Sequence, residues 1–455
     1  MAKRRETSKR PELLPDEAQV LGIRDSLYDV IPLGALERDL INTSAFLRLQ
    51  QIKQLGFVYR IWPGATHTRY EHSLGVYYLA LRALRLLLQR RHAGLRLSDA
   101  EQATKPARAL LAAALLHDIG HYPFSHAIEE LGFPIEPHER VGRRIITEGE
   151  IAEVLQQHGL APDVVANLID LPRGQVHQGS MGVLAKLLSG ALDVDKLDYL
   201  PRDARACNVP YGGVDVTRLL GALRVESEGA TAQLAVDAKG ISPLHSLVHA
   251  RQEMFDNIYW HHTGRAMITM LLRAVQEALL SAAIAPADLV GHDDASLLAF
   301  LGGNRMPSAT RALVAGLRDR RAYKVVVELS SRAGKLYPLI NALYWDAAKR
   351  RRAELALAAD LSAVIEQPVP DWAILIDIPK PEKWEMDVTI IFDDPPLGMQ
   401  SVMSWVEATG QTADDLSRYE IHQRRVRLVA APEWRIAAQQ HHAVLLARLE
   451  HLAVL

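Results

Sequence analysis

The sequence has only one cysteine, Cys207, among its 455 residues. A single thiol excludes an internal disulfide framework and every metal site built from several cysteines. No apolar run reaches the roughly 18 residues that a membrane-spanning helix needs, and no hydrophobic signal region follows the basic start of the chain. With 52 basic and 54 acidic side chains, the protein also lacks the overall positive charge that attracts nucleic acid or anionic lipid. We therefore expect a soluble cytoplasmic protein with no membrane partner.

The glycine-rich loops that commonly bind nucleotide phosphates are absent as well. Neither GxxxxGK[ST] nor GxGxxG occurs in the sequence. This absence excludes a P-loop mechanism for any nucleotide chemistry that the protein performs.

Apolar residues recur with helical spacing over most of the chain up to about residue 280. Clear examples are residues 73–88 and 107–116, and the pattern returns over 243–283. Residues 223–238 interrupt it with two strand-like segments around Gly229, which predicts a hairpin. We expect a mostly α fold: a helical body with a short β-hairpin and a small α+β C-terminal appendage.

Composition divides the chain into four predicted regions. These are a mobile basic tail (1–20), the main helical domain (21–285), a helical extension of shorter helices (286–368) and a small α+β region (369–455). Within the last region three segments are strand-like and one helix is expected to close the chain: 373–378, 387–392, 424–429 and 433–452. No residue of this C-terminal region is expected to carry chemistry.

Histidine is abundant, and its distribution is uneven. Of 18 histidines, seven lie close together: His67, His72, His92, His117, His121, His126 and His138. The densest stretch follows an apolar helix that should end near Gly120, because glycine suits a left-handed C-cap and Pro123 comes shortly afterwards. Adjacent helical residues point about 100° apart, so His117 and Asp118 can share one ligand only near the helix end. A metal ion satisfies that arrangement.

An imidazole beside a carboxylate suits a divalent cation such as Mn, Fe, Zn, Ni or Mg. Two ligands are too few, and His72 and Asp195 are the candidates for the others. Such a mixed set leaves positions open for water and a substrate oxygen, which is typical of a catalytic site. A lone His-Asp pair at a helix end is more often a solvated terminus. The coincidence of several motifs is what favours the metal site.

Four segments together resemble the HD-domain phosphohydrolases: 52–56, 63–76, 117–126 and 193–199. The similarity runs from about Ile31 to Ala274. It is greatest to the deoxynucleoside triphosphate triphosphohydrolases, in the branch of the animal sterile-alpha-motif and HD-domain enzyme. The roughly thirty residues before Ile31 are too few for a sterile alpha motif domain, so we expect none. The main helical domain, residues 21–285, would then be an HD catalytic domain.

The resemblance implies a role for each matching residue. The metal ligands would be the H…HD…D set: His72, His117, Asp118 and Asp195. Arg69 and Lys196 would contact phosphate. The phosphates would be surrounded by His121, His126 and His138, one of which would protonate the leaving oxygen. Water attack at the α-phosphorus would release a deoxynucleoside and intact triphosphate, and a second Mg would accompany the substrate triphosphate.

A nucleoside site is implied in the same way. Its residues would be Gln54, Leu55, Tyr199, Asp203 and Tyr259, and Arg251 would reach from there to phosphate. Gln54 would read the 3′-hydroxyl and Leu55 would crowd the 2′ carbon, although Leu55 and Tyr259 are equally well explained as core residues. Pro201 lies inside the helix that should carry Asp203, and we expect it to kink that helix.

The resemblance also implies partners: a nucleotide substrate, a nucleotide activator and a homo-oligomer, either dimer or tetramer. Where the animal enzyme reads an activating guanine, this sequence has Asn42, Leu47 and Gln50, which argues against a guanine-triggered switch. Basic runs at 318–321, 349–352 and 424–427 leave nucleic acid open as a partner, but such runs are most often solvated faces.

Two alternatives to a deoxynucleoside triphosphate triphosphohydrolase stay open at this point. One is an HD-type phosphohydrolase or phosphodiesterase acting on another nucleotide or on single-stranded nucleic acid. The other is a nucleotide-binding regulatory protein with weak or lost hydrolysis, which the intact ligand set argues against.

Overall fold

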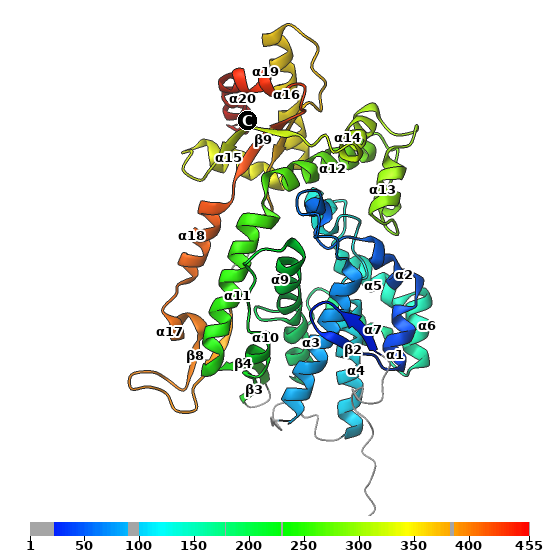
Figure 1. The fold of residues 1–455 in the computed structure, drawn as a ribbon, viewed down its shortest axis with the longest axis vertical. Helices are drawn as coiled ribbons and strands as arrows, with labels where there is room; N and C mark the ends of the chain where they lie inside the picture. Colours follow the sequence, from blue (N-terminus) through cyan, green and yellow to red (C-terminus); the bar gives the residue numbers. More distant parts are fainter. Residues whose placement is uncertain (1–21, 90–99, 178, 229–230, 383–385, 455) are drawn as a thin grey trace, which may run out of the picture.

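The computed structural model describes residues 22–89, 100–177, 179–228, 231–382 and 386–454. The predicted tail, residues 1–20, lies outside this part of the chain. Within it, helices predominate and the strands form three small sheets, which confirms the predicted fold class (Figure 1). No helix of the described residues is both long enough and apolar enough to cross a membrane.

A bundle of mostly short helices forms the body that carries the histidine-rich segment. A two-stranded antiparallel ribbon, β1 (Gly22–Asp25) and β2 (Asp29–Pro32), precedes it. The helices are α1 (Ala35–Ile41), α2 (Ser44–Arg48), α3 (Arg69–Gln89), α4 (Ala100–Leu116), α5 (His138–Thr147), α6 (Gly149–Gln157), α7 (Pro162–Ile169), α8 (Gly179–Leu188), α9 (Val194–Cys207), α10 (Val216–Leu220) and α11 (Ile241–Met254).

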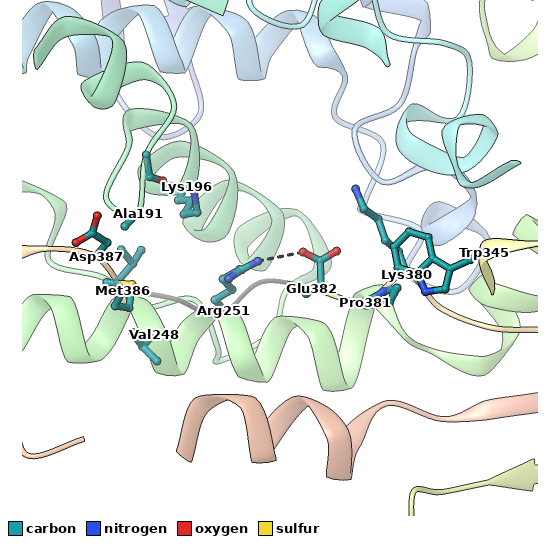
Figure 2. A pocket seen from close by; sticks show the side chains of 12 residues that line it. Ala191, Lys196, Val248, Arg251, Trp345, Lys380, Pro381, Glu382, Met386 and Asp387 are labelled. Carbon is teal, nitrogen blue, oxygen red and sulfur yellow. Dashed lines mark hydrogen bonds and ion pairs between the residues drawn. The ribbon is translucent and has the colours of Figure 1, made fainter. Parts of the chain in front are cut away.

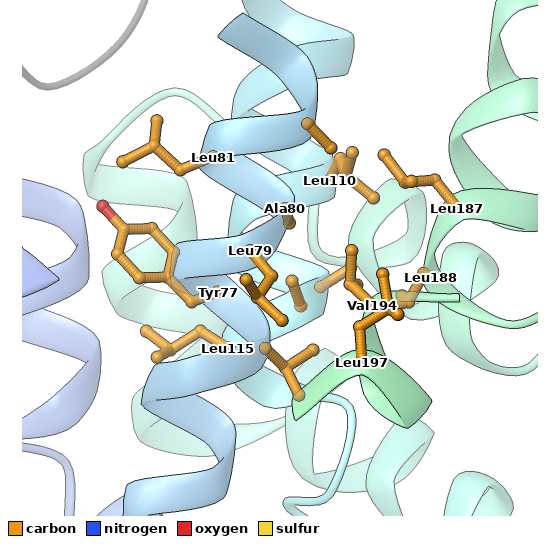
Figure 3. Close-up of a cluster of buried hydrophobic side chains, with 14 of the residues drawn as sticks. Tyr77, Leu79, Ala80, Leu81, Leu110, Leu115, Leu187, Leu188, Val194 and Leu197 are labelled. Carbon is orange, nitrogen blue, oxygen red and sulfur yellow. The ribbon is translucent and has the colours of Figure 1, made fainter. Parts of the chain in front are cut away.

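Helices α3 and α4 lie at the centre of this body and are apolar on several faces because other helices cover them. Leu79 of α3 and Leu110 of α4 meet Leu187 of α8 and Leu197 of α9 in one buried cluster (Figure 3). Complete burial of each such leucine stabilises the fold by about 1.5–3 kcal/mol. The cluster therefore fixes the ends of α3, α4 and α9 relative to one another.

The second half of the chain adds further helices and a three-stranded sheet. Its helices are α12 (His262–Leu280), α13 (Asp294–Leu301), α14 (Ser308–Arg318), α15 (Leu336–Ala342) and α16 (Ala347–Ile365). The expectation of only short helices in this stretch is wrong in two places. Helix α16 has 19 residues, and the β-branched run Lys324–Leu329 forms strand β5, which pairs with β9 (Val426–Ala430).

The three strand-like segments of the C-terminal region are confirmed, but they belong to two different sheets. Strand β6 (Ile374–Asp377) joins β9 and β5 in the order β5-β9-β6. Strands β7 (Thr389–Ile391) and β8 (Val402–Ser404) instead extend the predicted hairpin, which consists of β3 (Leu223–Glu228) and β4 (Thr231–Asp237). The region therefore forms part of the body as well as an appendage, while the predicted domain boundaries stay predictions.

Between β6 and β9 the chain passes along the length of the molecule and returns (Figure 1). The return uses α17 (Trp405–Thr409) and α18 (Ala413–Gln423), and Tyr419 of α18 donates a hydrogen bond to Asp256 beyond the end of α11. Two helices, α19 (Arg435–Gln440) and α20 (His442–Val454), replace the single closing helix that we expected. The outgoing segment, from Ile378 onwards, passes the mouth of the site described next.

Candidate metal centre and substrate pocket

The turn after α4 holds the central His-Asp pair. Helix α4 ends at Leu116, so His117 and Asp118 lie just beyond it. The expected left-handed C-cap at Gly120 is wrong, because Gly120 does not have a positive φ. Its lack of a side chain matters for another reason. A Cβ there would lie 2.1 Å from the carbonyl oxygen of His138 and 2.3 Å from the nitrogen of Gly142, so glycine lets this turn touch α5.

The structure brings the four predicted metal ligands together from α3, the turn after α4 and α9. His72 Nε2 lies 2.9 Å from Asp195 Oδ1 and 3.6 Å from Asp118 Oδ2. His117 Nε2 lies 3.4 Å from Asp118 Oδ1 and 3.7 Å from Asp195 Oδ1. Ligand atoms of His72, His117 and Asp195 all lie within 4.8 Å of one another. The set of two imidazoles and two carboxylates expected from the sequence is therefore assembled.

Hydrogen bonds to the other ring nitrogens orient both imidazoles. His117 Nδ1 lies 2.9 Å from the carbonyl oxygen of Ala114, and His72 Nδ1 lies 2.8 Å from Asp198 Oδ2. When Nδ1 donates, Nε2 presents a lone pair to the cluster. The two Nε2 atoms are buried and have no hydrogen-bond donor in the structure.

This arrangement fits a divalent cation. In this tautomer His72 Nε2 and the Asp195 carboxylate are both acceptors, and at 2.9 Å a positive charge must lie between them. Burial lowers the pKa of His72, but the adjacent carboxylates of Asp195 and Asp198 outweigh burial and raise it to about 10. The same electrostatic attraction that holds a proton here favours a metal cation, and the mixed N and O donors suit Mn, Fe, Zn, Ni or Mg.

Asp198 orients His72 and was not identified from the sequence. It accepts hydrogen bonds from Arg202 Nε at 2.8 Å, Arg202 Nη2 at 2.9 Å and the Tyr28 hydroxyl at 2.8 Å. Burial opposes its ionisation, but the Arg202 charge holds its pKa down at about 2. Arg202 is itself paired with Asp25 at 2.8 Å. The signal was present: Asp198 follows Asp195 by three residues, so both face the same side of α9.

Arg69 holds Asp118 in place. Its Nη1 lies 2.6 Å from Asp118 Oδ2, and its Nε donates to Ser125 Oγ at 3.0 Å. Although burial opposes ionisation, the Arg69 guanidinium keeps the pKa of Asp118 well below its ordinary value. Arg69 was predicted to bind phosphate. It lines the pocket, and its first contact is with a predicted metal ligand.

Three predicted catalytic histidines form a group beside the metal ligands. The rings of His121 and His138 stack with centroids 3.8 Å apart, and His121 Nε2 lies 3.0 Å from Asp118 Oδ1. Glu129, which was not predicted from the sequence, bridges His138 and His126. His138 Nδ1 lies 2.8 Å from Glu129 Oε1, and His126 Nδ1 lies 3.3 Å from Glu129 Oε2. The position of Glu129 three residues after His126, in the short helix η3 (Ser125–Leu131), was the available signal.

The environments of these histidines separate their pKa values. Burial lowers the pKa of His138, but the hydrogen bond and charge of Glu129 outweigh burial and raise it above the ordinary value. The pKa of His121 is well below the ordinary value, because burial and the nearby charges of Arg69 and His138 disfavour a proton there. The surroundings therefore favour a proton on His138 and disfavour one on His121. Such a division is typical of acid–base sites.

The metal ligands open into a cavity of about 460 Å³. Every residue predicted to bind substrate lines it: Gln54, Leu55, Lys196, Tyr199, Asp203, Arg251 and Tyr259. His117, Asp118, His126, His138 and Asp195 line it too, whereas His72 and His121 lie behind its wall. The C-terminal region contributes Lys380 and Glu382 to the lining, and the expectation that no residue of this region carries chemistry stays a prediction.

The part of the pocket lined by Asp203, Tyr259 and Gln54 is polar. Asp203 Oδ1 lies 2.7 Å from His67 Nε2, and its Oδ2 accepts a 2.7 Å hydrogen bond from the Tyr259 hydroxyl. Gln54 Oε1 is buried and without a donor. Pro201 was expected to kink the helix that carries Asp203. Helix α9 nevertheless continues through Pro201 to Cys207, and Asp203 lines the pocket.

Comparison with known protein families agrees with this site. Residues 69–203 match the HD domain, and residues 214–426 match the HD associated region. The first match begins at Arg69 and ends at Asp203, so it contains all four predicted metal ligands. The second contains Arg251, Tyr259, Lys380 and Glu382.

The chain is also similar in sequence to individual proteins. The uncharacterized protein MJ1154 of Methanocaldococcus jannaschii is 32% identical over 287 residues, which are 61% of this chain and 54% of that protein. The human deoxynucleoside triphosphate triphosphohydrolase SAMHD1 is 29% identical over 285 residues, 56% of this chain and 44% of that protein. The chain thus spans about half the length of these curated relatives. The crystal structure of a phosphohydrolase from Bacteroides thetaiotaomicron has a TM-score of 0.66 at 22% identity and covers 90% of this chain and 100% of its own, which shows a shared fold.

Proposed function

Because the chain carries an HD domain followed by an HD associated region, and resembles the deoxynucleoside triphosphate triphosphohydrolases as predicted, we propose that it hydrolyses deoxynucleoside triphosphates. The reaction is water attack at the α-phosphorus, which releases a deoxynucleoside and intact triphosphate. One observation carries the proposal. A single cavity joins the His-Asp metal ligands to a polar part where a buried amide oxygen, that of Gln54, has no donor.

A divalent cation held by His72, His117, Asp118 and Asp195 would polarise a phosphoryl oxygen and lower the pKa of a water. The protein groups around it bind and orient the substrate. Lys196 and Arg251 line the cavity on the side of Asp195 and offset the charge of the phosphate chain. A second Mg on the triphosphate would offset the rest of that charge.

Proton transfer to the leaving oxygen belongs to the histidine group in this proposal. His138 is the better proton carrier of the stacked pair, because Glu129 raises its pKa while the surroundings of His121 lower that of His121. His126 shares Glu129 with His138, and its ring centroid lies 5.3 Å from that of His138. An acid whose pKa lies near the working pH is the most effective donor to an alkoxide-like leaving group.

Recognition of the sugar follows from the polar part of the pocket. The free acceptor of Gln54 suits a hydroxyl donor such as the 3′-OH, and Leu55, which is half-buried beside it, offers no partner to a 2′-OH. Asp203 and Tyr259 hold each other and flank the same space. A ribose would place its additional hydroxyl against an apolar side chain, which costs free energy when the hydroxyl is buried.

The test is product identification. Purified protein is incubated with each dNTP and each NTP in the presence of Mn or Mg, and the products are separated. Deoxynucleoside together with intact triphosphate supports the proposal. Stepwise loss of phosphate, or activity on oligonucleotides alone, contradicts it and favours the alternative HD-type phosphohydrolase.

Variants connect the activity to the site. His117→Ala and Asp118→Ala should each remove bound metal and turnover together. His158→Ala is the control, since His158 is paired with Asp39 away from the pocket. An unchanged rate in either site variant would contradict the metal assignment. The homo-oligomer, the nucleotide activator and the cytoplasmic location stay predictions; light scattering with and without dNTP measures the first two.

A further inference from the structure

A second cavity of about 560 Å³ adjoins the substrate pocket (Figure 2). The two share four residues: Lys196, Arg251, Lys380 and Glu382. Lys196 comes from α9 and Arg251 from α11, whereas Lys380 and Glu382 come from the segment that follows β6. The boundary between the cavities is therefore made by three cations and one carboxylate.

The three cations differ in whether a carboxylate already neutralises them. Lys196 Nζ lies 2.6 Å from Asp193 Oδ2, and Arg251 Nη2 lies 3.1 Å from Glu382 Oε2. For Lys380 no carboxylate of the described residues lies within ion-pair distance, and its side chain is exposed. Lys380 thus contributes an uncompensated positive charge at the junction of the two cavities.

The backbone around Lys380 is stiff and anchored. Pro379 and Pro381 flank it, and each fixes its own φ and favours an extended residue before it. The carbonyl oxygen of Pro379 accepts a 3.2 Å hydrogen bond from Arg424 Nη1. The backbone of this segment therefore loses little conformational entropy when Lys380 binds a ligand.

We propose that the second cavity binds the triphosphate chain, both as the tail of the substrate and as the released product. Lys380 is the phosphate-binding cation that the C-terminal region supplies. Glu382 is an internal carboxylate that occupies Arg251 until a terminal phosphate displaces it. This inference rests on the proposed function, because that reaction releases triphosphate and the proposed phosphate contacts Lys196 and Arg251 line both cavities.

The exchange of Glu382 for phosphate is physically reasonable. A phosphate offers more negative charge and more acceptor oxygens to a guanidinium than a carboxylate does. The Glu382 side chain is 23% exposed, so it can turn to solvent without leaving a buried charge behind. Since a water occupies about 30 Å³ in the liquid, the cavity has room for a hydrated phosphate chain.

The experiment measures binding of inorganic triphosphate to the full-length metal-loaded protein by isothermal titration calorimetry. Lys380→Ala should weaken binding about tenfold, the equivalent of about 1.4 kcal/mol, and Lys380→Arg should restore most of it. Glu382→Gln should tighten binding several-fold, because it removes the competing charge. Lys335→Ala and Glu450→Gln, which change exposed residues elsewhere, are the controls.

Two results would overturn the inference. One is unchanged triphosphate affinity in Lys380→Ala. The other is weaker binding in Glu382→Gln, which would make Glu382 a structural partner of Arg251 and no competitor. The assay is independent of hydrolysis. If the wild-type protein binds triphosphate in this pattern but cleaves no dNTP, the proposed function fails and the cavity assignment stands. If it cleaves dNTP while all variants bind triphosphate equally, the cavity assignment fails alone.

Discussion

His72 Nδ1 and Asp198 Oδ2 lie 2.8 Å apart, and both side chains are completely buried. The opposite nitrogen of His72 faces Asp118 and Asp195, so Asp198 decides which nitrogen is available to a cation. Carboxylates in this position behind a ligating histidine typically change metal affinity 10–100-fold. Asp198 thus belongs to the candidate metal centre, where it lies behind the proposed ligand His72.

Replacing Asp198 with asparagine should therefore lower metal affinity by about 10–100-fold, as measured by competition with a chromogenic chelator. The matched control is Asp203→Asn, which changes another buried carboxylate of α9 that contacts His67 and Tyr259. That control should retain metal while losing activity. Equal metal affinity in the two variants would show that Asp198 does not act through His72.

The close contact between Gly120 and α5 leads to a second prediction. Gly120→Ala places a Cβ 2.1 Å from the carbonyl oxygen of His138, so either the turn bearing His117 and Asp118 or α5 must move. Overpacking of this kind costs about 1–3 kcal/mol, and the movement should reduce turnover by more than the loss of stability explains. Urea unfolding and activity assays measure the two effects.

Gly142→Ala is the control for that substitution. Gly142 lies in α5 at the same contact, but its added Cβ would meet nothing nearer than Ile119 Cγ2 at 3.4 Å. Because alanine is the better helix former by about 1 kcal/mol, this variant should be at least as stable as the wild type and fully active. Equal damage from both substitutions would contradict the steric explanation.

The metal ligands could be identified from the sequence because local signals mark them. His117 and Asp118 follow an apolar helix, and His72 and Asp195 lie in the first turns of α3 and α9. Residues that orient the ligands or the predicted catalytic histidines are not marked in this way. Asp198 and Glu129 reveal their roles only once the facing histidine is known, and that pairing depends on how the helices pack.

The C-terminal region shows a different limit of sequence analysis. Its strands could be recognised from β-branched residues, but which sheet each one joins depends on long-range pairing. Strands β7 and β8 extend the hairpin of the body, and Lys380 and Glu382, which follow β6, line the substrate pocket. Both residues lie in a proline-rich stretch that reads as a simple turn.

The unpartnered oxygen of Gln54 gives a prediction about the sugar. Gln54→Ala should lower kcat/KM for dNTP about tenfold, since a buried hydrogen bond to the 3′-hydroxyl is worth about 1–1.5 kcal/mol. Gln51→Ala, at an exposed position nearby, should change nothing. The decisive comparison uses a 2′,3′-dideoxynucleoside triphosphate, which has no 3′-hydroxyl. Wild type and Gln54→Ala should cleave it at equal rates, and a tenfold difference would mean that Gln54 acts on another group.

The bond between Glu129 and His138 sets a pH dependence. A histidine whose pKa is raised stays protonated to higher pH, so activity that needs this proton is present below the raised pKa and is lost as pH rises through it. Glu129→Gln removes the charge that raises this pKa, while burial, which lowers it, remains. The basic limb of the pH profile of kcat/KM should therefore move to lower pH in this variant.

Glu139→Gln is the graded control, because Glu139 lies farther from His138 Nδ1, at 3.5 Å against 2.8 Å for Glu129. It should move the limb in the same direction but less. A basic limb that stays in place in Glu129→Gln would contradict the role of His138 as the proton donor. A larger shift in Glu139→Gln than in Glu129→Gln would show that Glu139, and not Glu129, raises the pKa of His138.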